Sequence, residues 1–481
     1  MERKGTDSMA EREINKVHFI GIGGVGMSGI AHVAHDQGLI VSGSDLRESR
    51  YTQQLEDAGI TIHIGHDPAN IPDPAPDVVV VSTAILDNNP ELVAARERGI
   101  KVCHRAQMLA TLGHGKQTLA VAGTHGKTTT SSMLASTLDG MGLDPTFLIG
   151  GIVRSYHTNA HSGTGRYYVV EADESDKSFT YLDPYAVLVT NIEADHLDHY
   201  SDLQEIYRLF TRFMGSVPED GVIVVCGDRH DLVEHAKQTG RRVVTYGFGD
   251  ECDAQIINYV PCGIGSTFSL RLPNDMVVSS GVKQNPGQHN ALNAAGVLTM
   301  IWALDEDVQK AAEILRDFAG VRRRFDLVGK AHGVTIVDDY AHHPTEIAAT
   351  ITAADKLDFK RVIVLFQPHR YSRIKLFTEV LRKQFSHAFD GADEAVFMDV
   401  YPAGEMPIPG VSGQTFMEVL NDNPDHPKLH YVARRQEIVS YLMTQVRPGD
   451  LVITMGAGDV TAMGPQLLDE LQAVDASSSQ E

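Results

Sequence analysis

The sequence predicts an α/β protein of three domains, each built around a mainly parallel sheet. Its 481 residues exceed a single ordinary core, and division by a typical domain of roughly 150 residues gives about three domains. Short apolar stretches of strand length alternate with longer segments suited to helices, as in a doubly wound parallel sheet. Glycine-rich turns directly follow apolar stretches at residues 21–26, 123–128 and 456–459. Such turns at strand ends are typical of this fold class.

The composition excludes several classes of protein. The formal net charge is -22, with 41 Lys and Arg against 63 Asp and Glu, so we expect no nucleic-acid partner, which would need a clustered basic surface. The first residues are polar, and no run of about 18 apolar residues occurs, so we expect a cytoplasmic protein without a membrane partner. The four cysteines form no CxxC pair, which fits a reducing compartment.

The first expected domain, residues 1–110, begins with an apolar strand at Val17–Ile20. A glycine turn follows, and the small and apolar residues of Met27–Gln37 suit a packed helix. Two further short strands are expected at Leu39–Val41 and Val78–Val81. This alternation predicts a Rossmann-like domain.

The glycine turn of this domain has the spacing of a diphosphate-binding fingerprint. Gly21, Gly23 and Gly26 lack side chains, which lets backbone N–H groups and a helix N-terminus approach a pyrophosphate. Asp45, nineteen residues after Gly26, lies where a Rossmann fold places its ribose-binding acid. A nicotinamide cofactor is one interpretation, and a tight turn without a ligand is another. The motif alone is too common to decide between them.

The central domain, expected at residues 111–325, begins after a break at Leu109–Gln117, where glycines and polar residues gather. Its expected strands are Thr118–Ala122, Tyr167–Val170 and Ala186–Thr190. Each ends in a polar cluster. Because the carboxyl ends of parallel strands carry the ligand-binding loops, these clusters predict a site.

The turn after the first of these strands, Gly123–Thr128, has the ending of a phosphate loop. Its backbone amides can cradle phosphates, Lys127 can neutralise their charge, and the Thr128 hydroxyl can ligate Mg²⁺. It departs from the general pattern GxxxxGK[ST] because only two residues separate Gly123 from Gly126. The turn predicts ATP and Mg²⁺ binding.

Two acidic segments, Glu171–Asp176 and Asn191–Asp198, follow the next two strands. Carboxylates at such positions suit a hard cation. A solvated loop with incidental histidines is an alternative for the second segment. A zinc site at His196 and His199 is less favoured, because no thiolate or regularly spaced third ligand accompanies them.

The third domain, expected at residues 326–481, begins after the basic run that ends at Arg324. Strands are expected at Val334–Val337, Val362–Phe366 and Leu451–Thr454, and a glycine turn follows the last of them. The Ser-rich tail from residue 476 is expected to be disordered.

The shortened phosphate loop, together with the two acidic segments in this order, resembles the Mur ligase and folylpolyglutamate synthase superfamily. The resemblance implies an ATP- and Mg²⁺-dependent amide ligase with an ATP-binding central domain. It implies that Glu171 and Thr128 bind a Mg²⁺ that bridges the ATP phosphates, and that His196 binds a second Mg²⁺. The residues that would hold the ATP phosphates are Gly123, Thr124, His125, Gly126, Lys127, Thr128 and Thr129.

Three later segments also resemble the family. His289, Asn290 and Asn293 resemble its adenine-binding helix start, although in isolation they would be read as a helix cap. Arg324 resembles the arginine that reaches the ATP phosphates, and Asp339 the acid that holds the ATP ribose. These likenesses imply that the third domain contributes to nucleotide binding.

The segment Gln367–Arg373 resembles the part of the alanine-adding branch that binds the incoming amino acid. His369, Arg370 and Arg373 would bind L-alanine, because two arginines three residues apart can grip a carboxylate. Alternatively, the two arginines are surface residues at a helix start that bind no ligand. The absence of lysine from Leu197 to Val217 also matches this branch, since related ligases carry a carbamylated lysine there.

The same resemblance assigns UDP-N-acetylmuramate as the other substrate and makes hydride chemistry unnecessary. Ser82, Thr83, His104 and Arg105 resemble loops that line the UDP-sugar site. With the first glycine turn, the expected UDP-sugar residues are Gly21, Gly23, Gly24, Gly26, Met27, Asp45, Ser82, Thr83, His104 and Arg105.

The implied mechanism activates the muramate carboxylate as an acyl phosphate, which L-alanine then attacks. Lys127, Glu171 and His196 are expected to be catalytic, and His343 and His369 are both candidates for the base. The rival functions are a ligase that attaches a preformed tripeptide to the same sugar, an NAD-dependent oxidoreductase and a noncatalytic nucleotide sensor. A monomer or weak homodimer is expected.

Overall fold

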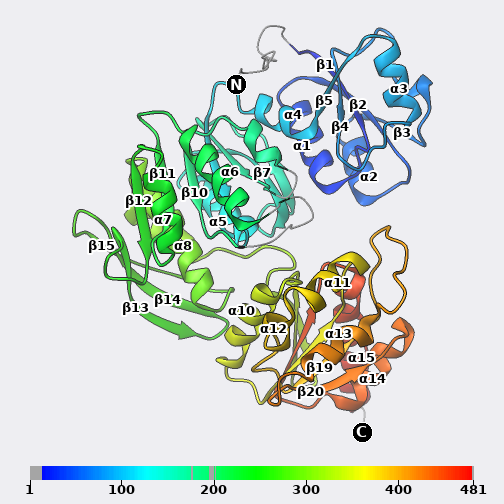
Figure 1. Cartoon of the computed structure of the whole chain (residues 1–481), viewed down its shortest axis with the longest axis vertical. Coiled ribbons are helices and arrows are strands. Elements are labelled where there is room, and N and C mark those ends of the chain that lie inside the picture. The colour runs from blue at the N-terminus through cyan, green and yellow to red at the C-terminus, as the bar shows by residue number, and fades with distance from the viewer. Residues whose placement is uncertain (1–13, 175–176, 194–199, 201, 479–481) are drawn as a thin grey trace. The chain divides into compact units, whose positions relative to one another are not determined.

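The computed structural model describes residues 14–174, 177–193, 200 and 202–478 (Figure 1). The chain divides into two compact units. The first unit comprises residues 1–256, 271–278 and 295–314, and the second comprises residues 257–270, 279–294 and 315–481. Three sheets run through these units, which confirms the predicted α/β fold with parallel-sheet domains.

The amino-terminal sheet has the strand order β3-β2-β1-β4-β5 and is parallel throughout. Its predicted strands are confirmed, although β2 continues to Asp45, and β3 was missed because its Thr-Ile-His-Ile sequence is short and partly polar. The elements are β1 Lys16–Ile20, α1 Val25–Asp36, β2 Ile40–Asp45, α2 Arg50–Asp57, β3 Thr61–Ile64, η2 Pro68–Asn70, β4 Val78–Val81, α3 Pro90–Glu97, β5 Lys101–His104 and α4 Arg105–Leu112.

The central sheet has ten strands in the order β15-β14-β13-β12-β11-β10-β6-β9-β7-β8. The pairs from β13 to β7 are parallel, and β8 pairs with β7 in the antiparallel sense. The elements are β6 Gln117–Ala122, α5 Lys127–Gly140, β7 Thr146–Val153, β8 Thr158–His161, β9 Tyr167–Glu171, η3 Ser178–Tyr181, β10 Ala186–Val189, α6 Leu203–Gly215, β11 Val222–Cys226, α7 His230–Lys237, β12 Val243–Gly247, β13 Ala254–Cys262, β14 Gly265–Arg271, β15 Val277–Val282, α8 Gln288–Ala303 and α9 Val308–Leu315.

The carboxy-terminal sheet has the order β16-β17-β21-β18-β19-β20, and only the β16–β17 pair is antiparallel. The elements are β16 Asp326–Ala331, β17 Val334–Asp339, α10 Pro344–Asp355, β18 Arg361–Phe366, α11 Tyr371–Glu379, α12 Arg382–Ser386, β19 Glu394–Phe397, α13 Gly413–Leu420, β20 Lys428–Tyr431, α14 Arg435–Gln445, β21 Asp450–Met455, η4 Asp459–Ala462 and α15 Met463–Ser478.

The prediction of a disordered tail from Ala476 is wrong for the residues that the structure describes. Helix α15 continues through Ser478. Its earlier residues Met463, Leu467 and Leu471 lie buried at helical spacing against the sheet. This packing stabilises the helix, and the serines that follow are within the range of helix propensity.

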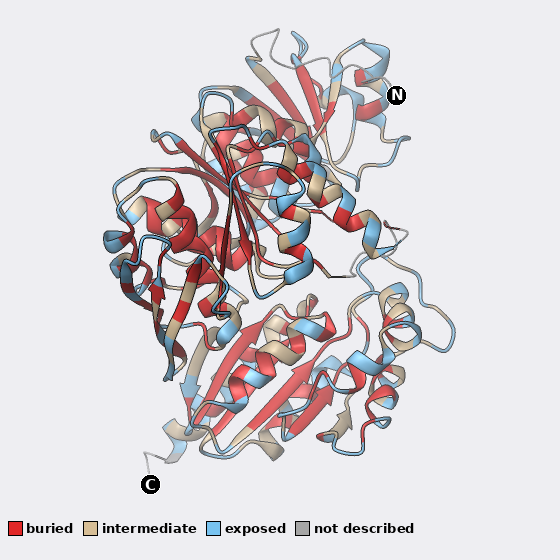
Figure 2. Cartoon of the chain, turned by 60° about the vertical axis from the view of Figure 1, so that its left-hand side comes forward, coloured by how far each residue is buried: buried red, intermediate tan, exposed pale blue. Residues whose placement is uncertain are grey.

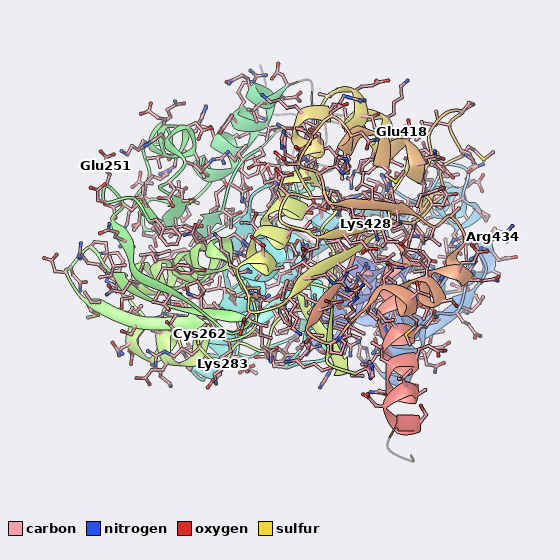
Figure 3. All side chains as sticks on the ribbon, turned by 90° about the horizontal axis from the view of Figure 1, so that it is seen from below. Glu251, Cys262, Lys283, Glu418, Lys428 and Arg434 are labelled. Carbon is pink, nitrogen blue, oxygen red and sulfur yellow. The ribbon has the colours of Figure 1, made fainter. Side chains whose placement is uncertain are left out.

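The apolar strands lie in the interior of the protein. The strands of each sheet are mostly buried, and the helices expose one side (Figure 2). Charged side chains such as Glu251, Lys283 and Arg434 are exposed (Figure 3). Within the described part of the chain, no helix is both long enough and apolar enough to cross a membrane.

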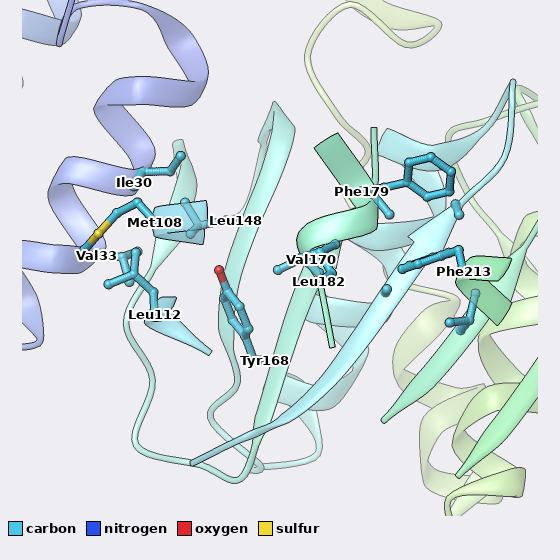
Figure 4. Close-up of a cluster of buried hydrophobic side chains, with 14 of the residues drawn as sticks. Ile30, Val33, Met108, Leu112, Leu148, Tyr168, Val170, Phe179, Leu182 and Phe213 are labelled. Atoms are coloured by element: carbon cyan, nitrogen blue, oxygen red, sulfur yellow. The ribbon is translucent and has the colours of Figure 1, made fainter. Parts of the chain in front are cut away.

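One apolar cluster joins the first two sheets within the first unit (Figure 4). Ile30 and Val33 of α1 and Met108 of α4 belong to the same cluster as Leu148 of β7. Asn159 also donates to the Val25 carbonyl, 3.2 Å away. The start of α1, which follows the first glycine turn, is therefore fixed against the central sheet.

A buried charge lies under the first glycine turn. Glu91 of α3 is fully buried and is 2.9 Å from Nε2 of His18 and 2.9 Å from Nδ1 of His66. Burial alone would raise the pKa of Glu91, but hydrogen bonds from His18, Asn70, Ser44 and His66 outweigh it and lower the pKa to about 2. The ionised carboxylate thus ties α3 to β1 and β2.

We expect Glu91→Gln to destabilise the amino-terminal domain in a pH-dependent way. Because the folded-state pKa lies below the ordinary 4.5, the carboxylate's contribution is fully present above pH 4.5 and is lost as the pH falls through about 2. We therefore expect the free energy of unfolding, measured by urea denaturation from pH 7 to pH 2.5, to differ most between variant and wild type at neutral pH. The difference should narrow below pH 4.5. A constant difference would contradict the ionised state.

Candidate active site

The first glycine turn packs its backbone against the end of β2. The N–H groups of Gly21 and Ile22 both donate to the Ser44 carbonyl, at 2.8 and 2.9 Å. Gly23 N–H donates to the Asp45 carboxylate at 2.9 Å. A Cβ at Gly23 would lie 2.8 Å from the Thr52 side chain, so only glycine fits. The turn and Asp45 are thereby held as one unit.

The other expected UDP-sugar residues surround the start of α1 and the ends of β4 and β5. Gly24 is the N-cap of α1, and Gly26 and Met27 lie in its first turn. Ser82 and Thr83 follow β4. His104 caps α4, its Nδ1 accepting from Ala106 N–H at 3.3 Å, and Arg105 begins that helix.

Arg105 links this region to the central sheet. Its guanidinium is 3.7 Å from the carboxylate of Asp173, which follows β9. A Cβ at Gly26 would lie 3.8 Å from Arg105 Nη1. The structure therefore brings the first glycine turn, Arg105 and the acidic end of β9 together in one unit.

The second glycine turn connects β6 to α5 and is held by the end of β10. Gly123 has φ 133°, and a Cβ there would lie 2.2 Å from Thr190 Oγ1. Thr124 N–H donates to the Asn191 carbonyl at 3.0 Å, and His125 N–H donates to Asn191 Oδ1 at 2.9 Å. These contacts explain why the loop can be two residues shorter than the general pattern.

Lys127 begins α5 and points back over the loop. Its ammonium donates to the carbonyls of Gly123 at 2.6 Å and Thr124 at 3.2 Å, and to Glu174 at 2.9 Å. Burial alone would lower the pKa of Lys127, but the carboxylates of Glu174, Asp173 and Glu171 outweigh it and raise the pKa. Lys127 is therefore a charged group at neutral pH.

The Thr128 hydroxyl and Glu171 form a second contact at this loop. Thr128 Oγ1 donates to Glu171 Oε1 at 2.9 Å, and Gly150 N–H donates to Glu171 Oε2 at 2.7 Å. A hydroxyl and a carboxylate side by side are hard oxygen ligands, which fit Mg²⁺. Thr129, also in the first turn of α5, is buried. The predicted metal residue His196 lies outside the described residues.

Four supporting residues of this site have no recognisable sequence signal. Glu174, Asn191 and Glu193 lie within the two acidic segments, where their individual roles depend on the fold, and the fourth is Arg229. Glu193 lies 3.4 Å from His125 Nε2 and 3.4 Å from Arg229 Nη1, and its N–H donates to Thr124 Oγ1 at 2.8 Å. No motif marked Arg229, because its contact depends on the pairing of β10 with β11.

The expected adenine residues lie at the start of α8, in the second unit. Asn290 Nδ2 donates to the Pro286 carbonyl at 2.9 Å, and Asn293 lies 3.4 Å from Asn290 Oδ1. Burial lowers the pKa of His289 to about 4, so the ring is neutral. A pocket of about 250 Å³ adjoins this helix start, lined by Tyr259, Gly287, Gln288, His289, Ala348 and Ala349 among others.

Asp339 and Arg324 lie together at the end of β17. The Asp339 carboxylate is buried and accepts from Phe325 N–H at 2.7 Å and Ala341 N–H at 2.8 Å. Burial raises its pKa to about 6, in spite of the nearby Arg324. Arg324 lies over the Tyr340 ring and 3.9 Å from Glu346. Because backbone donors take up the Asp339 carboxylate, its contact with ribose stays a prediction.

The residues expected to bind the amino acid lie at the end of β18. His369 stacks on Tyr401 with ring centroids 5.7 Å apart and meets the His342 ring edge-on at 6.3 Å. Burial, together with His342, Arg373 and Arg370, lowers the pKa of His369 to about 4. Arg370 is the N-cap of α11, and Arg373 lies in its first turn.

The two candidate bases have different surroundings. His343 is buried and caps α10, its Nδ1 accepting from Thr345 N–H at 3.4 Å. His369 Nδ1 is buried with no hydrogen-bond partner among the described residues. His343 Nε2 is buried as well, so burial does not separate the two histidines. His369 belongs to the segment that carries Arg370 and Arg373, which makes it the better placed of the two for contact with an amino acid.

Three segments of the chain match domains of one enzyme family. Residues 16–117 match the catalytic domain of the Mur ligase family, residues 121–301 the Mur ligase middle domain, and residues 323–458 the Mur ligase glutamate ligase domain. The chain belongs to the Mur ligase family.

Its similarity to curated members extends over nearly the whole chain. A UDP-N-acetylmuramate–L-alanine ligase of Thermobifida fusca is 43% identical over 477 residues, covering 97% of this chain and 98% of that protein. A ligase of the same name from Syntrophotalea carbinolica is 44% identical over 465 residues, covering 96% and 99%.

Solved structures agree. The UDP-N-acetylmuramate-alanine ligase of Thermotoga maritima matches with a TM-score of 0.79 at 28% identity, covering 95% of this chain and 99% of that one. A murein peptide ligase of Psychrobacter arcticus has the same coverage with a TM-score of 0.69 at 25% identity. The chain is therefore similar in full length to both kinds of ligase.

Burial raises the pKa of Glu174 to about 7 in spite of Lys127. Because the Lys127 ammonium lies 2.8 Å from the Glu174 carboxylate, we expect the two to behave as a buried ion pair. We expect Lys127→Met and Glu174→Gln each to lower the free energy of unfolding by about 3–5 kcal/mol. The first leaves the Glu174 carboxylate buried without its cation, and the second leaves the Lys127 ammonium without its closest carboxylate. The double variant should cost clearly less than the sum of the two. Urea denaturation of the three variants measures this coupling. Additive losses would mean that the two groups do not interact.

Proposed function

We propose that this chain is an ATP-dependent ligase that joins the amino group of L-alanine to the carboxylate of UDP-N-acetylmuramate, in peptidoglycan synthesis. The observation that carries the proposal is similarity across all three domains to ligases of that name, 97% of the chain in one case. ATP and UDP-activated sugars are cytoplasmic metabolites, which supports a cytoplasmic location. A monomeric or weakly dimeric state stays a prediction.

Lys127 and the loop before it would bind the ATP phosphates. A carboxylate resists an amine because its leaving group would be oxide, so it must first become an acyl phosphate. In-line transfer of the γ-phosphoryl group to the muramate carboxylate would leave ADP. The Lys127 ammonium, held at the loop by the Gly123 carbonyl, would offset the negative charge that develops during the transfer. The N–H groups at the start of α5, from Gly126 to Thr129, would orient the phosphates for that attack, because those of Thr124 and His125 donate to Asn191.

Magnesium fits the oxygen ligands at this loop. Thr128 and Glu171 would hold the ion against the ATP phosphates, and His196 stays the predicted ligand of a second ion. When bound, Mg²⁺ neutralises phosphate charge and lowers the cost of phosphoryl transfer.

The first glycine turn would bind the UDP diphosphate, with Asp45 on the ribose and Arg105 between the two substrates. Arg105 is suited to this position because it is charged and lies 3.7 Å from Asp173, beside the end of β9. Placing the sugar's carboxylate near the γ-phosphate requires the two turns to belong to one rigid body. The apolar cluster shared by α1 and β7 supplies that rigidity.

The amino acid would bind at the start of α11. Arg370 and Arg373 would hold the alanine carboxylate, and neutral His369 would accept a hydrogen bond from the amino group and orient it. The ammonium form would first lose a proton to solvent or to a phosphate oxygen, because only the neutral amine has the lone pair that attacks the acyl phosphate. Loss of phosphate from the tetrahedral intermediate then leaves the amide.

Phosphate release that depends jointly on UDP-N-acetylmuramate and L-alanine tests the proposal. We expect release with both present and none when either is omitted, and a lower kcat/KM for glycine, serine and a muropeptide-type tripeptide. A preference for the tripeptide would instead identify a recycling ligase.

Lys127→Ala should reduce turnover by at least a thousandfold while leaving the Kd for the UDP-sugar within twofold, because Lys127 acts on the phosphates.

Arg370→Ala should raise the KM for L-alanine by at least tenfold, with a smaller change in kcat, because it removes a charged partner of the ground-state carboxylate. Steady-state kinetics with alanine varied measures this. Arg434→Ala, at an exposed arginine of the same sheet domain (Figure 3), is the matched control and should keep wild-type constants. An Arg370 variant that loses only UDP-sugar affinity would place the residue in a different site.

A further inference from the structure

The segment that would bind the amino acid, Gln367–Arg373, is held from two sides by distant parts of the carboxy-terminal domain. On one side lies the turn after β21. Gln367 is buried, its Nε2 donates to Asp459 Oδ1 at 2.7 Å, and its Oε1 accepts from Val460 N–H at 2.9 Å. A Cβ at Gly458 would lie 2.2 Å from Gln367 Oε1. This side fixes the first residue of the segment.

On the other side lies the loop after β19, residues 399–405, which we call the clamp loop. Arg370 N–H donates to the Tyr401 carbonyl at 2.9 Å, and Tyr401 N–H donates to the Pro368 carbonyl at 2.8 Å. The clamp loop therefore pairs with the segment by its backbone. The Tyr401 ring stacks on His369 with an angle of 10° between the planes.

Glu405, at the end of the clamp loop, holds the first turn of α11. Its Oε2 accepts from Ser372 N–H at 3.0 Å, and its Oε1 accepts from the Ser372 hydroxyl at 2.6 Å. Burial alone would raise the pKa of Glu405, but these bonds and the charge of Arg370 outweigh it and lower the pKa. Glu405 is thus a carboxylate at neutral pH, next to a helix N-terminus and an arginine.

Arg370 has a backbone conformation that needs such support. Its φ is 64°, in the left-handed region that L residues with a side chain rarely adopt. This conformation turns the chain from β18 into α11, so it sets the directions of both Arg370 and Arg373. Strained residues of this kind persist where their surroundings hold them, and they gather at functional sites.

We propose that Glu405 is a positioning residue for amino-acid recognition: it bonds Ser372, between the two arginines, and fixes the turn from which both reach the amino acid's carboxylate. This inference rests on the proposed function. Glu405 does not contact the substrate. Its carboxylate acts on Arg370 by charge and on Arg373 through the helix backbone, and a neutral side chain of the same shape would keep weaker bonds to Ser372 and lose the charge.

The test compares Glu405→Gln with the wild type in phosphate-release kinetics on the full chain. We expect the KM for L-alanine to rise at least tenfold, with kcat within threefold and the KM values for ATP and UDP-N-acetylmuramate within twofold. Ser372→Ala removes one of the two hydrogen bonds and should raise the alanine KM about threefold. Glu405→Asp, which keeps the charge, should lie between Glu405→Gln and the wild type.

Glu418→Gln is the matched control, because Glu418 is an exposed glutamate of α13 in the same sheet domain (Figure 3). It should keep wild-type constants. An alanine KM for Glu405→Gln within twofold of this control overturns the proposal, and so does an equal rise in all three KM values, which would indicate a general structural defect. If the wild type shows no alanine-dependent phosphate release, the proposed function fails first, and that outcome is separate from the variant comparison.

Discussion

The position of β6 between β9 and β10 is the constraint on which the second glycine turn, residues 123–128, depends. Both neighbours are parallel to β6, so their carboxyl ends meet at the turn that carries Lys127. The end of β9 supplies Glu171 and Glu174, and the end of β10 supplies Asn191 and Glu193. The turn is two residues shorter than the general phosphate-loop pattern, and its shape is held by hydrogen bonds that its N–H groups donate to Asn191, at the end of β10.

This arrangement surrounds one buried cation with carboxylates. Lys127 meets Glu174 directly, and Glu171 and Asp173 add charge from further away. The proposed binding of the ATP phosphates calls for positive charge instead. The conflict is resolved if some of the carboxylates ligate a Mg²⁺ ion that is bound to the phosphates. The positive charge of the ion then offsets the negative charge of its carboxylate ligands. The excess of acid at the strand ends is thus an argument for a metal-dependent reaction.

Much of this could be predicted from the sequence, and the limits have physical causes. The strands before each glycine turn were predictable because they are continuous apolar runs, and the loop residues were predictable because a motif fixes their spacing. Arg229, Glu193 and Glu405 could not be assigned a role, since their contacts arise from strand order and from loops far apart in the chain. Strand β3 could not be predicted because its sequence is short and partly polar. The end of helix α15 could not be predicted because packing of Leu467 and Leu471 stabilises the helix in spite of its serine-rich end.

Burial is the main reason why the His369 ring is neutral. It lowers the pKa of His369 to about 4, and the charges of His342, Arg373 and Arg370 add to the effect. A base this weak cannot retain a proton taken from an ammonium group, whose pKa is several units higher, but it can accept a hydrogen bond and align the nitrogen. The proton must leave to solvent or to a phosphate oxygen before the neutral amine can attack. Burial, together with the arginines that would bind the alanine carboxylate, would therefore suit His369 to orient the nucleophile rather than to hold its proton.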